Sequence, residues 1–198
     1  MRIKIPFEKI YTSVFYVEQK DGVFLFDGGT DEEAAKRYIL PVVEKGKKPD
    51  YLIASHSHED HFGALPFLHR VFPQAKVAFF DERKLKEFDA NAFLLKDGQE
   101  ICGFRFLLTK GHSPDSLCAF NADTGEVYSF DSLQAGGAKG YGVLVRDSVE
   151  YERSVEKIRA LNPKKLYLSH AFLPLEKDTL CGEEIEWYLD ECIKKSKS

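Results

Sequence analysis

The chain has 198 residues, of which 43% are hydrophobic and 30% are charged, and its formal net charge is -4. This length and composition are typical of one folded domain and exclude a disordered or fibrous chain. Because the small negative charge provides no large basic surface, we expect no nucleic-acid partner. We therefore predict a single domain over residues 1–198.

The sequence indicates neither a secretory signal nor a membrane-spanning segment. Residues 1–7 alternate charged and apolar side chains, and no apolar run approaches membrane-spanning length. We therefore expect a cytoplasmic protein that does not enter the membrane. The sequence does not determine its oligomeric state. The cysteines lack CxxC spacing, so we interpret them as buried or surface thiols: Cys102, Cys118, Cys181 and Cys192.

Short strands alternate with helices in the first half of the chain. β-Branched and aromatic runs bounded by turn residues predict strands at 2–6, 11–18, 23–26, 51–54 and 77–80. Helical spacing predicts helices from Glu32 to about Leu40, from Phe62 to Val71, and over the charged stretch 81–88. Pro41 should kink the first of these helices or begin its second segment.

The second half follows a similar scheme. Strands are predicted at 104–109, 116–121, 126–130 and 165–168, and helices at 148–161 and 182–194. Four glycines in the segment 134–142 predict a loop that is free to move. Strands followed by helices in both halves favour an α/β layered sandwich over an all-α or all-β fold.

Three of the six histidines, His56, His58 and His61, fall within six residues, directly after the predicted strand 51–54. In extended backbone, residues two apart project to the same side, so His56 and His58 could bind one metal ion. If a helix begins near Glu59, Asp60 and His61 could face a second ion, with Asp60 providing a hard oxygen ligand.

Three more residues of ligand type lie at the ends of predicted strands. Asp131 and His170 directly follow strands, and His112 lies in a loop at a strand end. Such positions present side chains into a cleft. Ligand-type residues at the ends of so many strands are unlikely to have arisen independently by chance. His69 lies on the polar side of a predicted helix, and we expect it to bind no metal.

The segment His56-x-His58-x-Asp60-His61, followed in order by His112, Asp131 and His170, resembles the signature of the metallo-β-lactamase superfamily over nearly the whole chain. The resemblance implies a four-layer αββα sandwich. It also implies a first metal on His56, His58 and His112, a second metal on Asp60, His61 and His170, and Asp131 as the bridge. Asp27 matches a position that supports the ligands from behind, although simple turn chemistry in Asp27-Gly28-Gly29 explains it equally well.

Two divalent ions that share a water can lower its pKa from about 15.7 toward about 7, so a bridging hydroxide is the predicted nucleophile. We expect Asp60 also to orient this hydroxide. Zinc is the expected ion, with iron and manganese as alternatives, because histidine and carboxylate ligands suit several divalent metals.

The resemblance leaves several substrates open, among them thioesters, lactones and phosphodiesters. Zinc β-lactamases have Cys or Ser where this chain has Asp131, which argues against antibiotic hydrolysis. The short chain after His170 argues against an authentic glyoxalase II, which carries a further helical domain. The family's Thr-Pro-Gly-His reads Thr-Lys-Gly-His at residues 109–112, and Ser169 replaces a usual glycine. We predict hydrolysis of a small ester, thioester or lactone, with a phosphodiesterase as the alternative.

Two residues of the glycine-rich loop are candidates for substrate binding. Tyr141 could donate a hydrogen bond to a bound carbonyl, and Lys139 could attract a carboxylate. A second class of function is a persulfide dioxygenase-like oxidoreductase with one iron, and a third is a sensor that has lost catalysis. Metal content and oxygen consumption would distinguish these classes.

Overall fold

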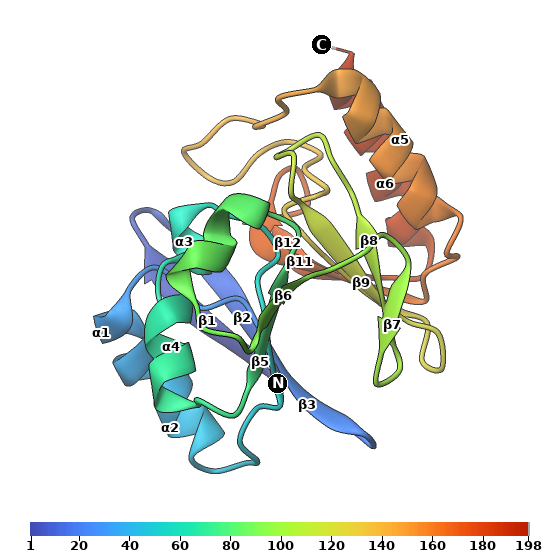
Figure 1. The fold of residues 1–198 in the computed structure, drawn as a ribbon. Helices are drawn as coiled ribbons and strands as arrows, with labels where there is room; N and C mark the ends of the chain where they lie inside the picture. Colours follow the sequence, from blue (N-terminus) through green and yellow to red (C-terminus); the bar gives the residue numbers. More distant parts are fainter. Residues whose placement is uncertain (198) are drawn as a thin grey trace. The chain divides into compact units, whose positions relative to one another are not determined.

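The structure is a computed structural model, and it describes residues 1–197. The chain forms two compact units, Met1–Leu95 and the part that begins at Lys96, each with its own six-stranded sheet (Figure 1). The single domain that we expected over residues 1–198 stays a prediction, and the two units are described separately below.

The sheet of the first unit has the strand order β1-β2-β3-β4-β5-β6. The first three strands are antiparallel, and β3 to β6 are parallel, because helical segments connect these later strands. The strands are β1 (Arg2–Phe7), β2 (Ile10–Gln19), β3 (Gly22–Phe26), β4 (Tyr51–Ile53), β5 (Lys76–Phe79) and β6 (Ala92–Leu94).

Short helical segments follow these strands. The first runs as α1 (Glu32–Ala34), the π-helical turn η1 (Ala35–Ile39) and α2 (Leu40–Val43), with Pro41 in the first turn of α2. Pro41 thus marks a second segment, one of the two predicted outcomes. The others are α3 (Glu59–Phe62), α4 (Leu65–Val71) and the 3-10 helix η2 (Glu82–Glu87).

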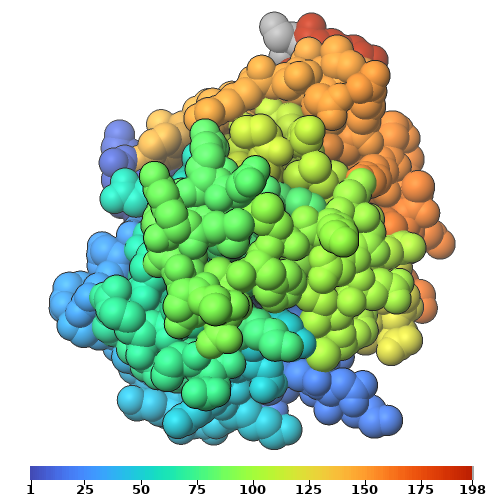
Figure 2. Space-filling model, viewed as in Figure 1, coloured from blue at the N-terminus to red at the C-terminus, as the bar shows by residue number. Residues whose placement is uncertain are grey.

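The core of this unit lies on one face of its sheet. Val14 and Tyr16 from β2 alternate along the strand and join Leu25, Leu52 and Val77 of the next strands, together with apolar residues of the helical segments. This packing fixes the ends of β3 and β4, from which the candidate ligands of this unit project. In Figure 2 the stretch after β5 that contains η2 and β6, drawn in green, forms part of the side of this unit turned to the viewer, beside earlier residues drawn in teal and blue.

The sheet of the second unit has the order β12-β11-β10-β9-β8-β7. Its neighbours are antiparallel except β10 and β11, which are parallel because α5 connects them. The strands are β7 (Gln99–Ile101), β8 (Phe104–Leu108), β9 (Leu117–Asn121), β10 (Glu126–Phe130), β11 (Lys165–Phe172) and β12 (Lys177–Cys181).

Two helices, α5 (Ser148–Arg159) and α6 (Glu183–Ser196), lie side by side in this unit (Figure 1). Asp147 begins α5, because its side chain accepts a hydrogen bond from the Glu150 amide. Each helix buries one apolar face, which includes Tyr151 on α5 and Tyr188 on α6. Within residues 1–197, no helix combines the length and the hydrophobicity that crossing a membrane requires.

The predicted α/β sandwich class is confirmed, while some elements differ from their predictions. β6, β7 and β12 were not predicted, because their three to five residues show no clear apolar run or alternation. The predicted α-helix over 81–88 is a 3-10 helix instead. The strand predicted at 165–168 continues to Phe172, which changes the position of His170.

Two of the four cysteines, Cys118 and Cys192, lie in the core of the second unit. Burial raises the pKa of each thiol to about 12. Both therefore stay protonated at neutral pH and pack as small apolar side chains, as the sequence indicated.

Candidate metal centre

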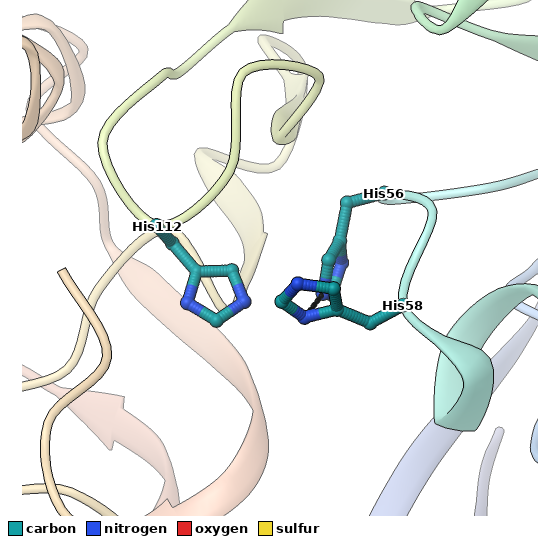
Figure 3. A group of neighbouring side chains, drawn as sticks. All are labelled: His56, His58 and His112. Atoms are coloured by element: carbon teal, nitrogen blue, oxygen red, sulfur yellow. Dashed lines mark hydrogen bonds between the residues drawn. The ribbon is translucent and has the colours of Figure 1, made fainter. Parts of the chain in front are cut away.

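His56 and His58 lie in the loop that follows β4. The Nε2 atom of His56 is 3.0 Å from Nδ1 of His58, and the two rings meet edge to face with centroids 4.5 Å apart (Figure 3). His56 is buried, whereas His58 is partly exposed. Extended backbone at this strand end therefore places two imidazole nitrogens next to each other, as the spacing predicted.

Asp60 and His61 lie in α3, which begins after His58. Both side chains are buried, and His61 Nε2 is 3.2 Å from Asp60 Oδ2. The hydroxyl of Thr12, on β2, donates a hydrogen bond of 2.7 Å to the same Asp60 oxygen. No pattern in the sequence pointed to Thr12, because its partner lies 48 residues away along the chain.

Asp27 lies fully buried behind these histidines, at the end of β3. Its carboxylate accepts hydrogen bonds from the Ser55 amide (2.6 Å), the Ser55 hydroxyl (2.9 Å) and His61 Nδ1 (2.8 Å). Since the Ser55 proton points to Asp27, His56 Nδ1–H donates to the Ser55 oxygen at 3.0 Å. Both His56 and His61 therefore carry their proton on Nδ1 and present the Nε2 lone pair for a metal.

The charge state of Asp27 reflects two opposing effects. Burial raises the pKa of this carboxyl group above its usual value, and the nearby His61 and the hydrogen bonds from His61 and Ser55 offset only part of that rise. Three donors converge on its two oxygens, an arrangement that only the ionised carboxylate satisfies fully.

The turn after β3 packs tightly against α3. The Gly28 amide donates to the His61 carbonyl at 2.7 Å. Gly63 approaches the turn so closely that a Cβ atom there would lie 1.8 Å from the Thr30 carbonyl oxygen. Glycine at position 63 thus allows the contact that holds Asp60 and His61 in place.

In the second unit, His112 lies in the loop after β8. Gly111, with φ of +130°, lets this loop pass the α5 backbone, because a Cβ atom at this position would lie 2.5 Å from Cα of Tyr151. His112 Nδ1 donates to the Leu144 carbonyl at 2.9 Å. Its Nε2 atom is 3.6 Å from Asp131 Oδ2.

Asp131 directly follows β10, as predicted, and its side chain is buried. The oxygen that faces His112, Oδ2, is also 3.4 Å from Nε2 of His170. His170 does not follow a strand as predicted. It lies within β11, between Tyr167 and Phe172, where the pairing with β12 shifts register and the strand is irregular.

Four pairs of donor atoms within the units lie 3.0 to 3.6 Å apart: His56 with His58, Asp60 with His61, His112 with Asp131, and His170 with Asp131. Two ligands about 2.0–2.2 Å from one tetrahedral metal ion are separated by roughly 3.3 Å. The residues present therefore fit a divalent metal. Histidine and aspartate are also the residue types that bind such ions in each unit.

Lys139 and Tyr141 are exposed in the segment between Ala138 and α5, so their role in substrate binding stays a prediction. His69, on α4, lies 3.0 Å from the Asp89 carboxylate through its Nε2 atom. Gln134, which sequence reasoning overlooked, is buried with its side-chain nitrogen 3.0 Å from His112 Nδ1.

Residues 9–84 match the family model described as the metallo-beta-lactamase superfamily. This stretch contains Asp27 and the segment from His56 to His61. A structure of a metallo-beta-lactamase family protein from Thermus thermophilus superposes with a TM-score of 0.73 at 18% identity, covering 100% of this chain and 79% of that one. The chain thus matches the metallo-β-lactamase superfamily model over residues 9–84 and shares the fold of that structure. The predicted sandwich fold of this superfamily is thereby confirmed.

Two curated proteins similar to this chain have named activities. An atrochrysone carboxyl ACP thioesterase from Aspergillus fumigatus is 29% identical over 60% of this chain and 37% of its own length. A hydroxyacylglutathione hydrolase from Enterobacter sp. is 28% identical over 80% of this chain and 61% of its own length. The chain therefore spans between about a third and three fifths of these relatives.

Proposed function

We propose that this protein is a metal-dependent hydrolase that acts on a small ester, thioester or lactone. In this proposal His56, His58 and His112 hold one divalent ion and Asp60, His61 and His170 hold a second, with Asp131 shared between them. Zinc is the expected metal.

One observation carries the proposal. A single oxygen of Asp131 faces the Nε2 atoms of both His112 and His170, at 3.6 and 3.4 Å. A carboxylate oxygen between two metal-binding imidazoles is the arrangement expected of a bridge between two ions. The proposal assigns the first unit's pair His56 and His58 to the first ion, and its pair Asp60 and His61 to the second.

Divalent ions at such a site lower the pKa of water and polarise the substrate's carbonyl oxygen. The protein's own residues contribute orientation. Thr12 holds one Asp60 oxygen by its hydroxyl proton, which leaves the second oxygen to accept a hydrogen bond from an attacking water. Asp27 and Ser55 fix the His56 and His61 rings with Nε2 presented, so the ligands need little rearrangement on metal binding.

The preference for a thioester or related acyl substrate has independent support. One relative is named a thioesterase and another a hydroxyacylglutathione hydrolase. The chain also has Asp at position 131, where zinc β-lactamases carry Cys or Ser. Acyl transfer to water needs no serine or cysteine nucleophile when a metal activates the water.

Metal content of the protein purified without added metal, measured together with hydrolysis of thioesters and lactones, tests the proposal. We expect about two zinc or manganese ions per chain and hydrolysis that a chelator abolishes and added zinc restores. A phosphodiester in the same panel tests the alternative substrate. One iron per chain, with oxygen consumption on a persulfide and no hydrolysis, would contradict the proposal and support the dioxygenase class.

Replacing Asp27 with Asn should weaken metal binding by about 10–100-fold, the usual effect of losing a partner that orients a ligand. The amide has one acceptor oxygen, and its NH2 group would face either Ser55 or His61, both of which donate to Asp27. The His61 ring then loses its fixed tautomer. Titration of zinc against a chromophoric chelator measures the affinity.

Asp21→Asn is the matched control for this change, because Asp21 is exposed in the turn between β2 and β3 of the same unit. It should bind zinc as the wild type does. Equal zinc affinity in Asp27→Asn and Asp21→Asn would show that Asp27 stabilises the turn after β3 and does not orient a metal ligand.

A further inference from the structure

Gln134 is a buried side chain three residues after Asp131, and only 3% of its surface is exposed. Its Oε1 atom accepts a hydrogen bond from the Leu144 amide at 3.0 Å. Its Nε2 atom donates to the Asp131 carbonyl at 3.4 Å and lies 3.0 Å from His112 Nδ1. One amide group thus contacts two candidate metal ligands and a residue ten positions further along the chain.

The backbone of Gln134 is itself held firmly. Its amide donates to the Tyr151 hydroxyl at 2.7 Å, and that hydroxyl donates back to the Gln134 carbonyl at 3.2 Å. Tyr151 is fully buried on α5. Gln134 is therefore fixed to the helix, and its side chain reaches out from a rigid base.

Leu144 lies in the segment 139–146, which contains neither helix nor strand. Both of its backbone polar groups are taken up near the metal ligands, since its amide donates to Gln134 and its carbonyl accepts from His112 Nδ1 at 2.9 Å. The Leu144 side chain, in contrast, is 44% exposed. The segment is therefore held here by hydrogen bonds rather than by burial of its side chain.

The bond to Leu144 decides the proton position on His112. A carbonyl oxygen can only accept, so His112 Nδ1 carries the proton and Nε2 presents a lone pair. Nε2 is the atom that faces Asp131 Oδ2. With Nδ1 protonated, the Gln134 NH2 group 3.0 Å away contacts this nitrogen without donating to it, and the link from Gln134 to His112 runs through Leu144.

We propose that Gln134 is a positioning residue, which holds Leu144 where its carbonyl fixes His112 in the tautomer that binds metal through Nε2. The segment 139–146, which also carries Tyr141, is thereby coupled to His112. This inference rests on the proposed metal function for its effect on metal affinity. Its structural part, the bond from Leu144 to Gln134, does not depend on that function.

Gln134→Met keeps the length of the side chain and removes its hydrogen bonds. In metal-free protein we expect the Leu144 amide to exchange with solvent about tenfold faster, since a hydrogen bond of ordinary net strength changes an opening equilibrium by about that factor. Zinc affinity should fall by about 10–100-fold. Nitrogen NMR of the His112 ring should show that the Nδ1–H tautomer is no longer the sole form.

Two further variants make the test specific. Gln134→Glu keeps an acceptor for the Leu144 amide, so the slow exchange of that amide should return. Gln99→Met is the matched control, because Gln99 Oε1 also accepts a backbone amide, that of Lys96, at 2.9 Å on the exposed side of the same unit. It should leave Leu144 exchange and zinc affinity unchanged.

If the Leu144 amide of Gln134→Met exchanged at the wild-type rate, the proposal would be overturned. It would also be overturned if this amide exchanged faster while the His112 tautomer stayed unchanged. If Gln134→Met does not fold, Gln134→Glu decides: exchange as fast as in an unfolded chain would also overturn it. A wild-type protein that binds no zinc would refute the proposed function instead, while the exchange measurement would still report on Gln134.

Discussion

Asp131→Asn is expected to lose metal and to lower hydrolysis by about 10³-fold or more, the equivalent of about 4 kcal/mol of transition-state stabilisation. The Asp131 oxygen that faces both His112 and His170 carries negative charge, and an amide oxygen in its place is a far weaker ligand. The change is nearly isosteric, so the effect measures charge and ligand strength rather than packing. Elemental analysis of the purified variant and a thioester assay provide the two readouts.

The control for Asp131→Asn is Asp123→Asn, the same change at an exposed position in the hairpin between β9 and β10. Asp123→Asn should keep its metal and its activity. The Asp131→Asn variant could instead retain two ions per chain and at least about a tenth of the wild-type rate, far more than the loss of a metal bridge would allow. That result would contradict a bridging role for Asp131.

Gly63→Ala is expected to destabilise the protein by about 3 kcal/mol, which for a chain of this size lowers Tm by roughly 6–12 °C. The new methyl carbon would lie 1.8 Å from the Thr30 carbonyl oxygen and 2.6 Å from that of Glu59. Since Gly63 has helical dihedral angles, with φ of -52°, alanine is acceptable to the backbone itself. The cost therefore comes mainly from forcing α3 away from the turn after β3, with a smaller part from the contact with Glu59.

The displacement of α3 should also be visible at the metal ligands. The Gly28 amide donates to the His61 carbonyl, so a shift of α3 moves His61 relative to Asp27. We expect Gly63→Ala to bind zinc more weakly as well as to unfold earlier, measured by calorimetry and zinc titration on the same preparation.

Gly142→Ala is the matched control, because a Cβ atom at this position meets nothing within 4 Å. It should change Tm by little. If Gly63→Ala unfolded at the same temperature as Gly142→Ala and bound zinc equally well, the close approach of α3 to the turn would not be what holds Asp60 and His61.

The two expected effects test the proposed metal function in different ways. Asp131 supplies ligand chemistry, so its loss should leave most of the stability of the second unit intact. Gly63 supplies a close packing contact, so its loss should reach the ligands only through the movement of α3. A comparison of Tm with zinc affinity across both variants separates these contributions.

The sequence by itself determined the candidate ligands and much of the fold. His56, His58, Asp60 and His61 fall within six residues, and a strand end and one helical turn are local structures that bring such neighbours together whatever the rest of the chain does. The longer strands and helices were likewise predictable, because their hydrophobic periods extend over several residues. The order of the later ligands carried the resemblance to the family.

Only the tertiary structure decided which residues support those ligands. Asp27 meets His61 across 34 residues of sequence, Thr12 meets Asp60 across 48, and Gln134 meets His112 across 22. Such contacts depend on strand register and on the path of irregular loops, which no local period encodes. The same reason explains the position of His170 inside an irregular part of β11 rather than after a strand.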